Sequence, residues 1–77
     1  MPEPKPWIVE IAQEHYRYGL GLLRLRVERV DTDPRHSQTY EGEIWIPVEG
    51  VQLTKDGAEV KRRSVLVRKR SLPPRPA

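Results

Sequence analysis

The distribution of proline limits where this 77-residue chain can fold. Six of its eight prolines lie at positions 2, 4, 6, 73, 74 and 76. Because proline donates no backbone hydrogen bond and favours extended polyproline geometry, neither end is expected to join a sheet or a helix. The sequence therefore predicts a proline-rich arm at residues 1–6, one small domain at residues 7–72 and a proline-rich tail at residues 73–77. A domain of this size has a thin hydrophobic core, so self-association into a homo-oligomer or binding to a partner is expected.

Residues 7–18 are compatible with two kinds of element. Helical spacing places Ile8, Ile11 and His15 on one face, and Pro6 and Gly19 stand where a helix would begin and end. The segment also opens with WIVEI, which is rich in β-branched side chains and alternates as a strand does. We favour a helix here and keep the strand as the alternative.

From residue 20 onward, hydrophobic and polar side chains alternate with the period of a β-strand. Leu23, Leu25 and Val27 alternate with charged residues, and a similar pattern returns at residues 40–48 after a polar loop at residues 31–38. These two segments are predicted to pair as a long hairpin. The inward side chains of its second strand are predicted to be Tyr40, Ile44, Ile46 and Val48.

A second hairpin is predicted around the sequence KDGA at residues 55–58. Asp-Gly is typical of the two central positions of a type I′ turn, where both residues need a positive φ. That turn would pair Leu53 with Val60 and Val51 with Arg62, so Leu53 and Val60 would share the inner face.

These segments predict a mainly β domain, either all-β or small α+β according to the structure of residues 7–18. Four to five short antiparallel strands, the last at residues 64–70, would form a rolled sheet or a small barrel of SH3-like or OB-like type. One N-terminal helix would precede them if residues 7–18 are helical. Both folds carry many unrelated functions, so the architecture favours a binding module without identifying its ligand.

The charge of the chain is distributed unevenly. Residues 1–59 hold seven basic and eleven acidic residues, whereas residues 60–77 hold seven basic residues and no acidic one. A basic block near a chain end is typical of a nucleic-acid contact, because each Lys or Arg that neutralises a phosphate releases a counterion. The residues predicted to bind DNA or RNA are Lys61, Arg62, Arg63, Arg68, Lys69 and Arg70. Alternation along a strand would place Arg62, Arg68 and Arg70 on one face.

The basic block also has a structural explanation. Charges on the last strand of a sheet prevent edge-to-edge pairing and keep a small protein soluble, and some of them can pair with acidic residues of the same chain or of another subunit. Arg24 and Arg26 are assigned a structural role of this kind. The long hairpin would place them across from the region of Glu41 and Glu43, where opposite charges support strand pairing.

The aromatic residues suggest two further contacts. Tyr16 and Tyr18 flank Arg17, and an arginine among exposed aromatics can stack on nucleobases; packing over the end of the core is the alternative for this pair. Trp45 is expected on the outer face of its strand, where either the N-terminal segment or a partner protein would cover it. The rival hypothesis is therefore an adaptor, inhibitor or small subunit that docks on a larger protein through Trp45.

The sequence contains no motif for catalysis or for a cofactor. It has no Cys, and its two His cannot complete a zinc site. Asp31, Asp33 and His36 could contact a divalent cation, but a polar loop needs the same residue types for its turns, and we favour that explanation. No apolar run approaches the length of a membrane span, and residues 1–6 do not resemble a signal peptide. We expect a cytoplasmic, non-enzymatic protein without metal or cofactor.

Overall fold

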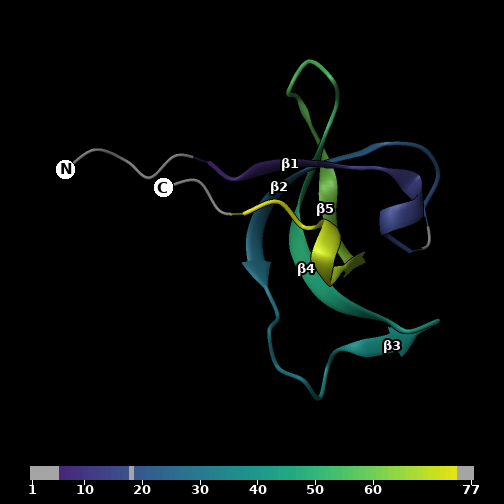
Figure 1. The fold of residues 1–77 in the computed structure, drawn as a ribbon. Helices are drawn as coiled ribbons and strands as arrows, with labels where there is room; N and C mark the ends of the chain where they lie inside the picture. The colour runs from purple at the N-terminus through teal and green to yellow at the C-terminus, as the bar shows by residue number, and fades with distance from the viewer. Residues whose placement is uncertain (1–5, 18, 75–77) are drawn as a thin grey trace.

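The computed structural model describes residues 6–17 and 19–74, which form five strands and two short 3-10 turns (Figure 1). The strands are β1 (Ile8–Ile11), β2 (Leu23–Val30), β3 (Gln38–Tyr40), β4 (Glu43–Leu53) and β5 (Glu59–Arg68), and the turns are η1 (Gln13–His15) and η2 (Lys69–Ser71). The prediction of a mainly β domain is confirmed. Most of the predicted arm and tail, residues 1–5 and 75–77, lies outside the described residues.

Strand β4 is the centre of an antiparallel sheet. β1 pairs with β2, while β4 pairs with β2, β3 and β5. Trp45 pairs with both Gln38 and Arg68, and Val48 pairs with both Val30 and Val65. Because a residue has only two hydrogen-bonding edges, β2 and β3 share one edge of β4 and β5 occupies the other. Figure 1 shows β4 curving through the centre of the molecule, with the tip of the β4–β5 hairpin at the top and β3 at the bottom.

The sheet is rolled but, over the described ranges, not closed into a barrel. Tyr16 forms a single bridge with Val67, and the N–H of Arg17 donates to the carbonyl of Leu66 at 3.0 Å. The segment that follows β1 and η1 therefore contacts the outer edge of β5 without forming a sixth strand. Of the two predicted forms, the structure has the open sheet and not the closed barrel.

The helix predicted over residues 7–18 is wrong. Residues 8–11 form strand β1, and only the single 3-10 turn η1 follows it. Val9 and Ile11 are each 2% exposed, whereas Ile8 is 48% exposed, so the side chains alternate between core and solvent with a period of two. Pairing with β2, together with the preference of β-branched residues for strands, outweighs the helical spacing of the polar positions.

One hydrophobic cluster on the inner face of the sheet forms the core. Its buried residues are Val9, Ile11, Tyr16, Leu23, Leu25, Val27, Ile46, Val48, Val65 and Val67. The predicted burial of Ile46 and Val48 is confirmed, but Tyr40 and Ile44 are exposed. They lie where β4 meets β3, and all three residues of β3 are exposed, so this end of the sheet extends beyond the core.

The first predicted hairpin is replaced by two separate pairings. β2 pairs with the second half of β4, where Val30 lies opposite Val48. The first residues of β4 pair instead with β3, and Glu41 and Gly42 form the two-residue loop between them, with φ of 50° and 78°. A type I′ turn requires positive φ at both central residues. The positive φ pair of a type I′ turn, which the sequence predicts at Asp56-Gly57, is therefore found at Glu41-Gly42 instead.

The second hairpin is in the predicted place but has a different turn. Gly57 has a φ of 88°, and its N–H donates to the carbonyl of Thr54 at 2.9 Å, which makes a longer loop with a bulge at the glycine. Val51 pairs with Arg62 as predicted, but Leu53 pairs with Glu59 because the register shifts after Gln52. Val60 is consequently 51% exposed whereas Leu53 is 6% exposed, so the two do not share a buried face as predicted.

Candidate functional site

Two residues of the predicted basic block are neutralised within the chain. Nη1 of Arg62 lies 2.6 Å from a carboxylate oxygen of Glu28, and Nη2 of Arg70 lies 2.7 Å from one of Glu43. These ion pairs bear out the structural explanation for part of the block. They also lower the positive charge that Arg62 and Arg70 offer to an external anion.

The rest of the block is divided between both faces of the sheet and turn η2. Val65 and Val67 point into the core, so Lys61 and Arg63 continue that inner face beyond the core, while Arg68 lies on the outer face. Nη1 of Arg63 donates to Oε1 of Gln52 at 3.1 Å. Lys69 and Arg70 lie in η2 and not on β5, so the predicted shared face of Arg62, Arg68 and Arg70 is wrong for Arg70.

The structural role assigned to Arg24 and Arg26 holds, but with different partners. Arg24 lies 3.0 Å from Glu10 on β1, and Arg26 lies 2.8 Å from Glu59 on β5. The expected acidic partners, in the region of Glu41 and Glu43, lie beyond the part of β4 with which β2 pairs.

Trp45 does not face solvent. Its side chain is only 5% exposed, so of the two covers expected for it, the one provided by the chain itself is present. Strand alternation does place the ring on the outer face, directly opposite Arg68 in the register. The guanidinium of Arg68 lies 5.2 Å from the centre of the Trp45 ring, and that of Arg17 lies 6.0 Å from it. Contacts within the chain therefore cover this tryptophan, and its contact with a larger protein stays a prediction.

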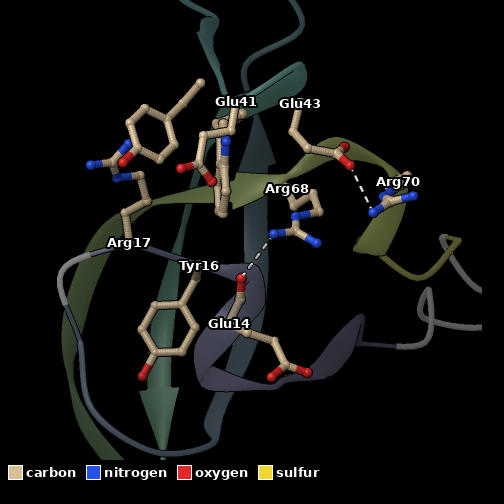
Figure 2. Close-up of a pocket in the computed structure, with 9 residues that line it drawn as sticks. Glu14, Tyr16, Arg17, Glu41, Glu43, Arg68 and Arg70 are labelled. Carbon is tan, nitrogen blue, oxygen red and sulfur yellow. Dashed lines mark hydrogen bonds and ion pairs between the residues drawn. The ribbon is translucent and has the colours of Figure 1, made fainter.

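These side chains surround a cavity of about 490 Å³, which we call the aromatic–arginine cleft (Figure 2). Its lining residues are Glu14, Tyr16, Arg17, Tyr40, Glu41, Glu43, Trp45, Arg68 and Arg70. In the view of Figure 2, Arg17 and Arg70 lie on opposite sides of the cleft with Arg68 between them. The guanidinium of Arg17 lies 4.5 Å from the centre of the Tyr40 ring. Aromatic rings in this cleft are thus already stacked with the chain's own arginines.

Tyr16 is a structural residue of this cleft. It is 5% exposed, its hydroxyl donates to the carbonyl of Gly21 at 2.8 Å, and it belongs to the core cluster. A Cβ at Gly19 would lie 2.2 Å from the ring, so only glycine lets the chain pass so close to the tyrosine. Of the two alternatives for the tyrosine pair, packing over the core applies to Tyr16. Tyr18, the second predicted stacking residue, lies outside the described residues.

A second cavity, of about 340 Å³, is also lined by Arg17, but its lining lacks the glutamates of the aromatic–arginine cleft. We call it the basic hollow, and its lining residues are Arg17, His36, Gln38, Pro47, Arg63, Ser64, Val65 and Leu66. None of these residues is acidic. The hollow combines two guanidinium groups with an imidazole, an amide and a hydroxyl, which are the side-chain groups that donate hydrogen bonds to anions.

Arg17 and Arg63 reach the hollow from segments far apart in the chain. The bond from the Arg17 N–H to the Leu66 carbonyl fixes Arg17 beside β5, while Arg63 lies three residues earlier on the same strand. His36 comes from the loop between β2 and β3, and Gln38 is the first residue of β3. Sequence reasoning missed His36 and Gln38 as neighbours of Arg63, because only the pairing of β4 with both β3 and β5 brings the two segments together.

The loop that carries His36 is held by its own carboxylates. The N–H of Asp33 donates to Asp31 at 3.0 Å, and this bond lowers the pKa of Asp31 below its ordinary value of 3.8. The guanidinium of Arg35 donates to Asp33 at 2.7 Å and lowers the pKa of Asp33 in the same way. Asp31 also lies 2.7 Å from Nδ1 of His36. These contacts agree with the interpretation of Asp31, Asp33 and His36 as turn-forming residues.

Residues 6–17 and 19–74 contain neither a metal-binding cluster nor a membrane-spanning helix. No group of three or more His, Cys, Asp or Glu in these ranges could hold a metal ion. No helix in them is long and apolar enough to cross a membrane.

Comparison of the chain with protein-family models, with curated proteins and with solved structures finds no match.

Proposed function

We propose that this protein is a small non-enzymatic module that binds DNA or RNA through its phosphates, and that the basic hollow is the centre of the contact. The observation that carries the proposal is the lining of this hollow, in which Arg17 and Arg63 contribute two guanidinium groups and no carboxylate is present. Arginine suits this role because its planar fork donates two hydrogen bonds to one phosphate.

The neighbouring cleft supports the same proposal. Arg17 lines both cavities, so a strand whose phosphate lies in the basic hollow would have its adjoining nucleotide beside Tyr40, which is exposed. Because the guanidinium of Arg17 already lies over the Tyr40 ring, a base would stack on the exposed part of that ring or on the Arg17 plane, and such stacking accepts bases of any identity. Little sequence preference is therefore expected.

The proposed nucleic-acid contact centres on fewer basic residues than the sequence predicts. Lys61 and Lys69 have no acidic partner among the described residues and would add phosphate contacts at its margins. Arg62 and Arg70 are secondary because Glu28 and Glu43 neutralise them. A bound phosphate would have to compete with those carboxylates.

A salt titration tests the proposal. The affinity for a fluorescently labelled single-stranded oligonucleotide should be measured by anisotropy from about 50 to about 200 mM salt, where phosphate contacts make log K fall with log salt. Arg63→Gln should weaken binding and reduce the salt slope by about one phosphate contact. Lys55→Gln is the matched control, because Lys55 carries the same charge and lies exposed in the loop of the β4–β5 hairpin.

Three results would contradict the proposal. One is undetectable binding at about 50 mM salt. Another is an affinity that does not change with salt. The third is an equal effect of Arg63→Gln and Lys55→Gln, since the attraction would then depend on net charge and not on the basic hollow.

A further inference from the structure

Part of the outer edge of β5 has no strand paired with it in the described part of the chain. On its other edge β5 pairs with β4 from Glu59 to Arg68. On the outer edge the contacts are the bridge between Tyr16 and Val67 and the bond from the Arg17 N–H to the Leu66 carbonyl. From Leu66 back towards Glu59, no further backbone hydrogen bond reaches this edge from residues 6–17 or 19–74. We call residues 61–65 the open edge of β5.

The bond at Leu66 identifies which backbone groups the open edge presents. The N–H and C=O of successive residues in a strand point to opposite edges. Because the Leu66 carbonyl points outward to Arg17, the groups of Ser64 and Arg62 also point outward, while those of Arg63 and Lys61 face β4. Both Arg62 and Ser64 are exposed. An incoming strand in line with the Tyr16–Arg17 segment would find two donors and two acceptors ready to pair.

The charge of the open edge selects the occupant. Lys61, Arg62 and Arg63 stand beside one another, and within residues 6–17 and 19–74 only Arg62 of these three has a carboxylate partner. A second copy of the chain that paired β5 with β5 would place basic residues opposite basic residues, which destabilises strand pairing. A strand with acidic side chains would place opposite charges next to Lys61 and Arg63 instead.

We propose that the open edge of β5 binds an extended acidic segment of another protein, which adds as a further strand beside Arg62 and Ser64. The partner contributes backbone hydrogen bonds to these two residues and carboxylates to Lys61 and Arg63. The proposal shares Arg63 and Ser64 with the basic hollow, but it differs from nucleic-acid binding because it requires backbone pairing and not phosphate. It returns to the protein partner inferred from the sequence but places the contact at β5 and not at Trp45.

Amide hydrogen exchange distinguishes backbone pairing from simple attraction of charges. The probe is a short capped peptide of alternating valine and glutamate, added to the intact protein. At about 90% saturation, exchange at the Arg62 and Ser64 amides should slow about tenfold, because only the free tenth of the protein exchanges. The Lys61 and Arg63 amides face β4 and serve as internal controls, so their exchange should change much less.

A second peptide of the same sequence and charge, N-methylated at its central residues, supplies the decisive comparison. Methylation removes the backbone donors but keeps every carboxylate, so its affinity should fall about tenfold or more if strand pairing holds the peptide. Equal affinity of the two peptides, or equal slowing at all four amides, would overturn the proposal. Sedimentation of the protein alone as a dimer that protects Arg62 and Ser64 would overturn it too, since the occupant would then be a second copy.

Discussion

Replacement of Trp45 by alanine is expected to lower the free energy of unfolding by about 3 to 4 kcal/mol. The side chain is 5% exposed, so nearly all of its roughly 200 Å² of burial is lost, and at about 25 cal/mol per Å² this corresponds to about 5 kcal/mol. The new alanine and the flexible side chains of Arg17 and Arg68, which lie against the ring, recover part of that amount. A domain of this size has a total stability of only about 4 to 12 kcal/mol, so the variant should be partly unfolded at moderate urea concentrations.

Urea denaturation followed by far-ultraviolet circular dichroism measures this loss. Leu20→Ala is the control, because Leu20 is 90% exposed and its loss should change the stability by less than about 0.5 kcal/mol. Trp45→Phe keeps an aromatic ring, but it replaces the indole by a smaller phenyl group and removes an N–H that has no hydrogen-bond partner among the described residues, so it should cost about 1 to 2 kcal/mol. If the free energy of unfolding of Trp45→Ala lies within about 0.5 kcal/mol of the wild-type value, the ring is not buried as described and does not line the aromatic–arginine cleft.

Two further predictions concern the sheet and the polar loop. Gly50→Ala should destabilise the protein by about 3 kcal/mol or more, because the new Cβ would lie 2.3 Å from the Arg26 carbonyl oxygen and force β2 away from β4. Gly42→Ala, at a φ of 78° with open space around it, should cost only about 1 kcal/mol, and equal losses in urea would contradict the reasoning. The lowered pKa of Asp31 and Asp33 predicts stability that is fully present above their ordinary value of 3.8 and is lost as pH falls through the folded-state pKa. Asp31→Asn should therefore flatten the acid limb of stability against pH, and an unchanged limb would count against the loop contacts.

The turns show what local sequence can and cannot determine. The glycine at position 57 correctly indicates the β4–β5 hairpin, because both a type I′ turn and a bulged loop need a positive φ there. The same residue cannot distinguish the two turns, and they differ by one residue in register. That single residue decides whether Leu53 lies opposite Val60 or Glu59. The turn at Glu41-Gly42 could not be predicted from its sequence, since glutamate rarely adopts a positive φ.

The candidate site was only partly predictable for a different reason. Alternation correctly places Trp45 on the outer face of β4, but the period of a strand does not tell whether that face is covered. The cover comes from Arg17 and Arg68, whose positions depend on the contact of the η1 segment with β5. The basic hollow likewise depends on tertiary pairing. Composition identified Arg63 as a candidate, whereas only the fold separates it from Arg62, which Glu28 neutralises.

The position of β4 at the centre of the sheet has a consequence for the order of folding. Two of its three pairings, with β3 and with β5, close short loops and cost little chain entropy. The pairing with β2 joins residues that are far apart along the chain, from Val30 with Val48 to Leu25 with Gln52. Because such long-range pairing forms slowly, docking of the β1–β2 unit onto β4 is expected to be the slow step. A nascent chain that has emerged only as far as Leu53 would expose one whole edge of β4. Until β5 is synthesised, that edge is the part of the molecule most open to aggregation.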